Sequence, residues 1–321
     1  MWFLFALICI LGWGSADLFY KKSSDECDRY SHLKIAVWVG IIMGACSVAL
    51  MFMPDLEGKS VGIGNLLSSA VKYLPASVGY IISMVIGYAG LRYLELSIVS
   101  PVQNASGALS AVCIIAVFLF KGKISSIGDE LSVIEIIGTL IIVAGVISLA
   151  FVEQNLSKAE SDNSDKKYKM GALALLFPIL YCVFDTIGTA ADGIILDEET
   201  GLGLGEIDVL ILYGLTFFAA GIGAWLFMLA KNKKPYIPFK RTESSKIKAA
   251  CCEEFGQVFY VYAMASRPVI AAPMVASYCI VSVILSRIIL KEKLKVSQAV
   301  CVISVIAGIV LLGIAEGLAE A

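Results

Sequence analysis

The sequence is dominated by ten apolar runs, each long enough to cross the hydrocarbon core of a bilayer as a helix. Of 321 residues, 59% are hydrophobic and only 16% are charged, so most of the chain is expected to face lipid or other helices rather than water. This pattern predicts an all-α integral membrane protein with ten transmembrane helices. The runs lie near residues 1–20, 33–53, 73–93, 98–120, 131–151, 170–195, 206–230, 247–266, 268–290 and 296–316.

The charge and the residues that bind metals exclude several function classes. Lys and Arg number 25 against 27 Asp and Glu, so no basic field exists that would attract nucleic acid. The nine cysteines show no C-x-x-C spacing, and the single histidine, His32, lies in a polar link, so no metal site is expected. No Walker A pattern occurs, which argues against ATP as the direct energy source. The sequence therefore predicts neither a cofactor nor an enzyme.

The positions of the basic residues predict an orientation in the membrane. The links that follow odd-numbered runs contain 20 of the 25 Lys and Arg residues. Because basic residues are enriched in cytoplasmic links, we expect these links to be cytoplasmic and both termini to lie outside. The expected location is the plasma membrane, as a multi-pass protein.

The two halves of the chain carry matching positions. Two aromatic and acid pairs match at an offset of 168 residues, and two prolines match at an offset of 172. Since each half holds five runs, an odd number, the second half must enter the membrane from the opposite face, as in the inverted repeats of alternating-access carriers. Chance similarity among apolar helices is the alternative. The matched positions are Trp13 with Tyr181, Asp17 with Asp185, and Pro101 with Pro273.

This division predicts two five-helix units joined by a polar linker. The expected parts are residues 1–152 as the first unit, 153–169 as the linker, 170–316 as the second unit and 317–321 as a short tail.

Three short segments carry a family resemblance. They are GLRYLELSIVSP at residues 90–101, LGWG at residues 11–14 and LKE at residues 290–292. In these segments the chain resembles the EamA-type transporters of the drug/metabolite transporter superfamily. The resemblance implies a ten-helix carrier or exporter of small metabolites. The sequence departs from the pattern at Gly122, where the first half would carry a glutamate like Glu292, and in its predicted outside termini.

The sixth run carries the richest set of polar side chains. Tyr181, Asp185, Thr189 and Asp192 follow one another at helical spacing, which places them on one stripe of the helix. An ionisable side chain inside a membrane span is costly unless it faces a polar cavity or a partner. Asp185 is therefore the leading candidate for proton coupling or for binding a substrate amine. The alternative is that these carboxylates only hold neighbouring helices together by hydrogen bonds.

The eighth and first runs contribute further acids. Glu253, Gln257 and Tyr260 share one helical face, with Glu254 alongside. Because Lys248 lies close by, the two glutamates could instead reach water at a helix end. Asp17 follows Trp13 by one helical turn, and an ion pair at the membrane interface with Lys21 or Lys22 is its alternative role.

A third set of candidates lies near the two prolines and in the third run. An aromatic ring there could stack on a ligand, and the small residues could instead permit close helix packing. The candidates are Tyr80, Gln103, Asn104, Ser106, Ser110, Ser277, Tyr278 and Ser282.

These observations predict a secondary transporter that carries a small polar metabolite, amino acid or amine-like compound by alternating access, driven by protons or by exchange. The expected partners are the small-molecule substrate, protons and the lipid bilayer; the oligomeric state stays open. A transport-inactive scramblase, sensor or scaffold is the alternative. An intramembrane enzyme is a more distant one, because the Glu253 and Glu254 pair lacks the arginine and histidines that such motifs need.

Overall fold

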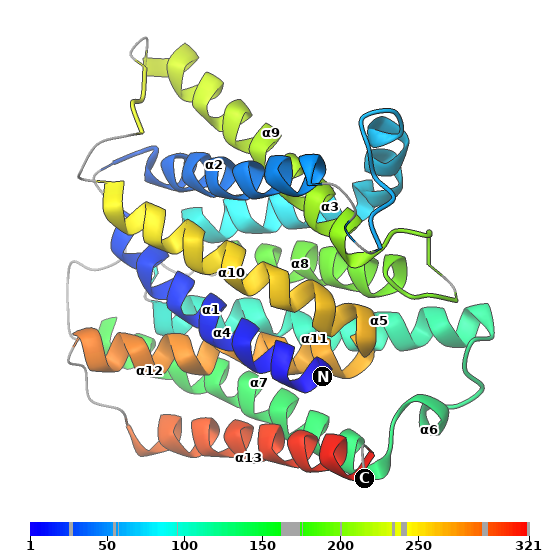
Figure 1. Cartoon of the computed structure of the whole chain (residues 1–321). Helices are drawn as coiled ribbons and strands as arrows, with labels where there is room; N and C mark the ends of the chain where they lie inside the picture. The colour runs from blue at the N-terminus through cyan, green and yellow to red at the C-terminus, as the bar shows by residue number, and fades with distance from the viewer. Residues whose placement is uncertain are drawn as a thin grey trace.

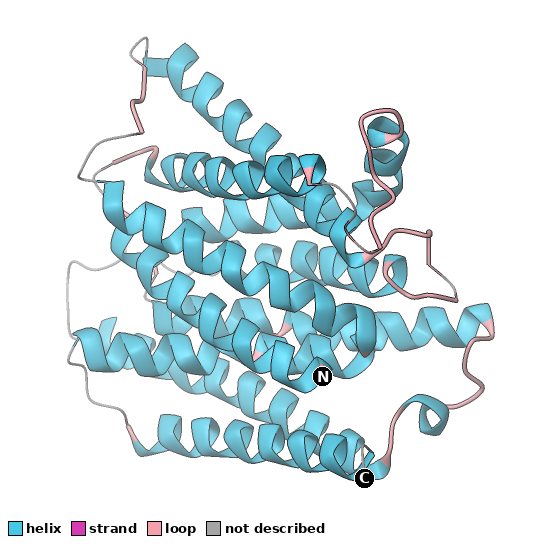
Figure 2. Ribbon diagram, in the orientation of Figure 1, coloured by secondary structure: helices cyan, strands magenta, loops and turns pink. Residues whose placement is uncertain are grey.

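The computed structural model consists of helices and the links between them in the part of the chain that it describes (Figure 2). The described residues are 1–25, 28–53, 56, 58–94, 96–161, 174, 176–199, 201–232, 235–238, 243–290 and 295–319. The helices are α1 (Trp2–Ser23), α2 (Ser31–Phe52), α3 (Leu66–Gly90), α4 (Leu96–Asn104), α5 (Ser106–Lys121), α6 (Ile127–Glu130), α7 (Val133–Ser161), α8 (Leu176–Ile195), α9 (Glu206–Asn232), α10 (Ser244–Ser266), α11 (Pro268–Ala276), α12 (Tyr278–Leu290) and α13 (Val296–Ala319).

Length and composition make most of the predicted runs candidate membrane spans. Within the described residues, nine spans are long and apolar enough to cross a bilayer. The eighth predicted run, 247–266, is not among them, although its helix α10 has 23 residues. Its sequence contains Lys246, Lys248, Glu253 and Glu254, which lower its mean hydropathy. The described part of the chain is therefore all-helical, and its apolar helices are those of a multi-pass membrane protein.

Two predicted spans are interrupted helices. The run at 98–120 divides at Ala105 into α4 and α5, and the run at 268–290 divides at Ser277 into α11 and α12. Pro101 and Pro273 lie inside α4 and α11, each four residues before the interruption. A proline removes the hydrogen bond from its own nitrogen to the carbonyl four residues earlier, so each proline weakens the short helix that precedes the break.

One further boundary differs from the prediction. Helix α7 continues to Ser161, nine residues into the predicted linker at 153–169, and residues 162–169 lie outside the described part. The helix continues because the first residues of this polar segment favour helical structure as well as the apolar run does.

The helices pack as pairs drawn from the two halves of the chain (Figure 1). Helix α2 packs on α9 at one edge of the molecule and α7 packs on α13 at the other. Between these edges α1 packs on α10 and α3 packs on α8, while α5 contacts α11 and α4 contacts α12. The interrupted helices therefore lie in the middle of the bundle.

Glycines set the distance within the main helix pairs. At each contact a glycine of one helix lies against the backbone of a glycine in the other, which allows the close approach typical of membrane helices. The contacts are Gly12 with Gly256, Gly40 with Gly221, Gly79 with Gly188 and Gly138 with Gly308.

Gly79→Ala tests this packing. A Cβ atom at Gly79 would lie 2.7 Å from the Gly188 nitrogen and 2.9 Å from the Phe184 carbonyl oxygen, both of them backbone atoms of α8. We expect the variant to lose about 1–3 kcal/mol of stability, because α3 and α8 must separate. Thermal unfolding of purified protein measures the loss. Gly223→Ala is the matched control, since no atom lies within 4 Å of its added Cβ; equal melting temperatures for the two variants would contradict the prediction.

Polar contacts tie the two halves together on the face that holds both termini (Figure 1). The amino group of Met1 lies 2.8 Å from a Glu316 carboxylate oxygen. On that face Lys123 pairs with Asp197, and Arg267 lies 3.0 Å from Glu135. On the opposite face, a lysine and an arginine at the ends of α1 and α3 donate to backbone carbonyls. Lys21 binds Leu91 and Leu94, and Arg92 binds Asp25 and Arg29.

Candidate functional site

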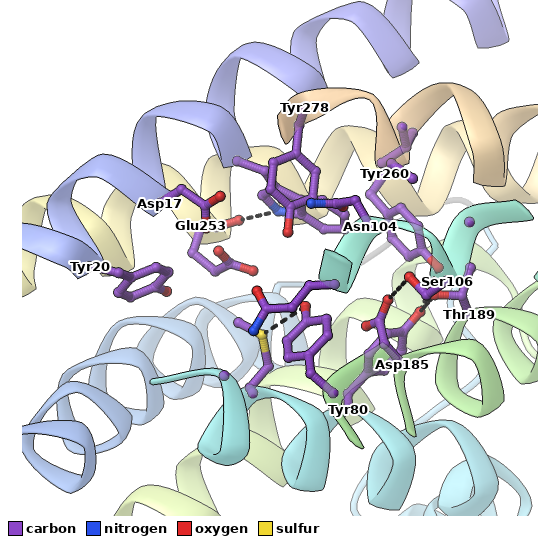
Figure 3. A pocket seen from close by; sticks show the side chains of 18 of the residues that line it. Asp17, Tyr20, Tyr80, Asn104, Ser106, Asp185, Thr189, Glu253, Tyr260 and Tyr278 are labelled. Atoms are coloured by element: carbon purple, nitrogen blue, oxygen red, sulfur yellow. Dashed lines mark hydrogen bonds between the residues drawn. The ribbon is translucent and has the colours of Figure 1, made fainter. Parts of the chain in front are cut away.

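A buried cavity lies where α1, α3, α8 and α10 meet the interrupted helices (Figure 3). Its volume is about 50 Å³. Twelve of the predicted site residues line it, drawn from both halves of the chain. They are Trp13, Asp17, Tyr80, Gln103, Asn104, Ser106, Tyr181, Asp185, Thr189, Glu253, Tyr260 and Tyr278.

Asp17 joins α1 to both interrupted spans. Its Oδ2 atom accepts a hydrogen bond of 2.6 Å from Ser100 in α4 and one of 2.8 Å from Ser282 in α12. The nearby Lys21 directs its ammonium group to the carbonyl oxygens of Leu91 and Leu94, 2.8 and 2.7 Å away. The carboxylate of Asp17 therefore belongs to the cavity wall.

Asp185 occupies a related position on α8. Its Oδ2 atom accepts a hydrogen bond of 2.6 Å from Ser106, the first residue of α5 after the break. Ser110, one turn further along α5, donates to the Thr186 carbonyl at 3.3 Å. Tyr181 and Thr189 line the cavity on either side of Asp185, as their helical spacing predicts.

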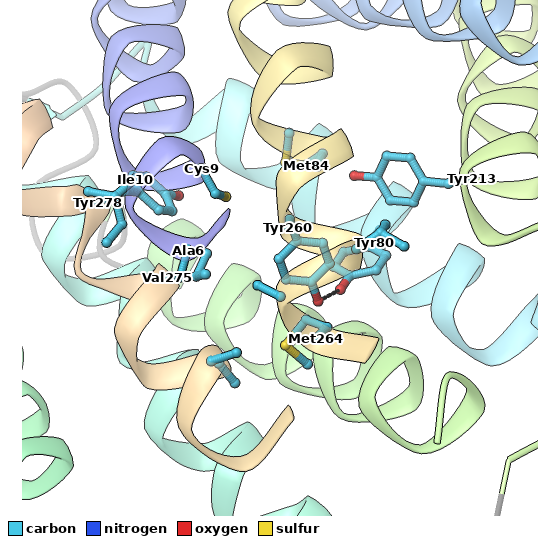
Figure 4. Packing of buried hydrophobic residues seen from close by; sticks show 14 of the residues in the cluster. Ala6, Cys9, Ile10, Tyr80, Met84, Tyr213, Tyr260, Met264, Val275 and Tyr278 are labelled. Atoms are coloured by element: carbon cyan, nitrogen blue, oxygen red, sulfur yellow. Dashed lines mark hydrogen bonds between the residues drawn. The ribbon is translucent and has the colours of Figure 1, made fainter. Parts of the chain in front are cut away.

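Asp192 lies outside the cavity lining and is fully buried. Its Oδ2 atom accepts a hydrogen bond of 2.9 Å from the Tyr80 hydroxyl, whose oxygen is 2.5 Å from that of Tyr260 (Figure 4). Thr189 is within 3.4 Å of the same Tyr80 hydroxyl. This cluster of Tyr80, Thr189, Asp192 and Tyr260 connects α3, α8 and α10 at one end of the cavity.

The two neighbouring glutamates of α10 have different surroundings. Glu253 is 6% exposed, lines the cavity and lies beside Asp17 and the Tyr20 hydroxyl (Figure 3). Glu254 is absent from the lining and interacts with Cys46 of α2. Gln257 is buried and also lies outside the lining. Of the α10 candidates, Glu253 and Tyr260 face the cavity.

Aromatic rings cover much of the cavity surface. The ring of Trp13 lies 4.9 Å from that of Tyr260 and 5.7 Å from that of Tyr278. The Trp13 indole nitrogen donates to the Glu253 carbonyl at 3.2 Å, which fixes the ring against α10. At the other end of the cavity the rings of Tyr20 and Tyr88 are 4.7 Å apart, and their hydroxyls are hydrogen-bonded at 3.2 Å.

Sequence reasoning missed three tyrosines of the cavity wall: Tyr20, Tyr88 and Tyr213. Tyr20 follows Asp17 by three residues and Tyr88 follows Tyr80 by eight, so helical spacing would have placed both on the faces already chosen. Tyr213 lies within an apolar run of α9, and no local pattern distinguishes it from a core residue.

The cavity combines acids and aromatic rings without a basic side chain. In the part of the chain that the structure describes, no residue of the lining is Lys, Arg or His. Three carboxylates line the cavity, those of Asp17, Asp185 and Glu253. No group of three His, Cys, Asp or Glu side chains among the described residues is placed to hold a metal ion. The cavity therefore presents acidic groups and aromatic rings to its contents.

Comparison with known proteins finds a family similarity in the second half of the chain. Residues 200–314 match the EamA-like transporter family. The predicted resemblance is confirmed. The matched segment comprises α9 to α12 and most of α13, with Tyr213, Glu253, Tyr260 and Tyr278 of the cavity. Helix α8, with Asp185, precedes the matched segment.

The fold is also similar to that of a solved structure. That chain, described only as a crystal structure of a protein, superposes with a TM-score of 0.62 at 13% sequence identity, covering 100% of this chain and 99% of the other. At that identity the likeness shows the fold alone. No curated protein matches the sequence.

Proposed function

We propose that the protein is a secondary transporter that carries a small polar metabolite, amino acid or amine-like compound across the plasma membrane by alternating access. The observation that carries this proposal is the cavity, which is buried in the middle of the bundle and is lined by polar groups from both halves of the chain. A buried polar cavity between two halves is what a carrier needs, because its substrate site must face either side of the membrane in turn.

The proposal includes ten crossings arranged as an inverted repeat. The amino group of Met1 contacts Glu316 of α13, so the first and last helices have their outer ends on one face. Both ends of a chain lie on one face only if the chain crosses the membrane an even number of times. Nine candidate spans are an odd number, which supports counting α10 as the tenth. The helix pairing fits the same repeat. In it α8 of the second half corresponds to α1, and α10 corresponds to α3, so the pair of α1 with α10 corresponds to the pair of α8 with α3. The outside location of both termini stays a prediction.

Alternating access requires contacts that open on one face while others close. Two ion pairs join one half to the other on the face that holds both termini. They are Lys123 with Asp197 and Arg267 with Glu135. At the other end of the cavity, Tyr20 of the first half lies beside Glu253 of the second half. Rocking of one half against the other would break one set at a time, with the interrupted helices bending between them.

Asp185 is the proposed proton-coupling group. Protonation removes its charge and weakens the carboxylate as acceptor for Ser106, whose hydroxyl it binds at 2.6 Å. Since Ser106 opens α5 directly after the break at Ala105, a proton on Asp185 would alter the contact between α8 and the interrupted span.

Proton flux into proteoliposomes tests this function. Purified wild type and Asp185→Asn are compared with an internal pH dye while pools of amines, amino acids and other small metabolites are added outside. We expect one pool to drive flux in the wild type, and the flux to fall at least about tenfold in the variant. Asp28→Asn is the control, because its carboxylate lies outside the spans and pairs with Lys34 at 2.5 Å. Equal fluxes in wild type and Asp185→Asn would remove Asp185 from the coupling step.

A further inference from the structure

The acidic lining of the cavity favours one of the substrate classes named in the proposed function. Three carboxylates line the cavity, and none of the described lining residues is basic. An amino acid or another zwitterion would place its own carboxylate in a buried site without a cationic partner, which is energetically unfavourable. An organic anion would meet the same cost with no compensating amine. A cation would be attracted by each of the three carboxylates.

We propose that the cargo is an organic cation, an amine or quaternary ammonium with an apolar body, and that the Glu253 carboxylate binds its charged group. This inference rests on the proposed transport function and names the substrate class of the same site.

The surroundings of the three acids favour Glu253. Each of them accepts a hydroxyl: Asp17 accepts from two serines, Asp185 from Ser106 and Glu253 from Tyr20. Glu253 differs in that it reaches the cavity with a second acid, Asp17, close by (Figure 3). An ammonium group beside Glu253 would therefore meet two neighbouring acidic groups.

The aromatic rings around this position match the rest of such a ligand. Two pairs of rings flank Glu253. Trp13 donates to the Glu253 backbone carbonyl and contacts Tyr278, while Tyr20 lies beside the Glu253 carboxylate and contacts Tyr88. Ring faces attract a quaternary or protonated amine by cation–π interaction and also cover its apolar carbons. A bare metal ion would gain little from these rings, and the described acids do not converge on a metal position. The combination therefore favours a cation with organic substituents.

Binding measured by isothermal titration calorimetry on full-length protein in nanodiscs tests the inference independently of transport. The cationic probes are tetramethylammonium, benzyltrimethylammonium and tetraphenylphosphonium, which share one charge and differ in the size of the apolar body. Phenylalanine and phenylacetate are the zwitterionic and anionic comparators. We expect at least one cation to bind at least about tenfold more tightly than either comparator. Tighter binding of phenylalanine or phenylacetate, or no binding of any cation, would overturn the proposal.

The variant Glu253→Gln keeps the size of the side chain and removes its charge. We expect it to weaken binding of the preferred cation by roughly 30-fold. Glu254→Gln is the matched control, because the adjacent carboxylate faces Cys46 of α2 and lies outside the cavity lining; we expect less than about a twofold change. Unchanged affinity in Glu253→Gln, or equal losses in both variants, would contradict the assignment. Both proteins are first checked for a single size-exclusion peak.

A second readout separates this inference from the proposed function. Liposomes loaded with the cation that binds are diluted, and exchange of the labelled cation across the membrane is followed. Exchange that Glu253→Gln slows supports both proposals. Binding without exchange would contradict transport of this cation and leave the cation site standing, whereas exchange of phenylalanine but of no cation would support a carrier and overturn the cation site.

Discussion

Asp17→Asn is expected to reduce transport about 100-fold while the protein still folds. The carboxylate accepts hydrogen bonds from Ser100 of α4 and Ser282 of α12, so it links α1 to an interrupted span of each half. Hydrogen bonds to a charged acceptor contribute about 1.5–3 kcal/mol each, and the amide weakens both. A loss of about 3 kcal/mol in the state that moves the substrate corresponds to roughly a 100-fold slower rate.

The measurement is the initial rate of cargo uptake into proteoliposomes with equal amounts of reconstituted protein. Ser304→Ala is the control, since this exposed hydroxyl donates only to the Val300 carbonyl of its own helix at 2.9 Å among the described contacts. A rate for Asp17→Asn within twofold of that of the control would show that the carboxylate is a structural group. Loss of the monodisperse peak would point instead to a folding role, which the double variant Ser100→Ala and Ser282→Ala would reproduce.

Asp192→Ala is expected to cost about 3 kcal/mol of stability, because the variant leaves buried hydroxyls without their acceptor. The Asp192 side chain is fully buried, and Tyr80 donates to it at 2.9 Å while sharing a 2.5 Å contact with Tyr260. Tyr73 also lies beside this carboxylate. Removal of the side chain would weaken the junction of α3, α8 and α10.

Thermal unfolding in detergent measures this effect, with Asp192→Asn as the conservative variant. The amide can still accept from Tyr80, so we expect a loss of about 1 kcal/mol. Asp185→Asn provides the contrast, because that carboxylate lines the cavity and we expect it to affect proton flux more than the melting temperature. An Asp192→Ala protein as stable as the wild type would rule out the structural role of the cluster.

Helical periodicity predicted one face of the site well. Tyr181, Asp185 and Thr189 recur at intervals of four residues, and all three line the cavity. Asp192 lies on the same stripe, yet it is seven residues beyond Asp185, which corresponds to about 10 Å along a helix. The cavity ends before that depth, so spacing alone placed one residue too many in it.

Periodicity could not decide between Glu253 and Glu254. Consecutive residues of a helix point about 100° apart, so a helix that turns one of them to a cavity turns the other away. The rotation of α10 is fixed by Gly256, whose missing side chain leaves room for Trp13 of α1. That contact joins residues more than 240 positions apart, and no local pattern contains it.

The sequence pattern was also insufficient to place the two prolines within their helices. The sequence matched Pro101 with Pro273 but placed each near the start of a single continuous span. Helix α11 begins at Pro268, as predicted, and α4 begins at Leu96, two residues before the predicted run, yet each helix ends soon after its proline and a second helix follows. Where a span is interrupted depends on how its neighbours pack against it, and this information comes from the tertiary structure.

By itself the sequence determined the class of the protein, because runs of about 20 apolar residues have no stable state in water and a helix satisfies its backbone hydrogen bonds within the run. It also determined that acids and aromatic residues lie within those spans, at a cost that only a polar cavity or a partner offsets. The tertiary structure decided which of those acids face one another across the cavity. Helix rotation, depth and interruption depend on contacts between distant glycines, prolines and rings, so Asp17, Asp185 and Glu253 became one site only when the two halves packed together.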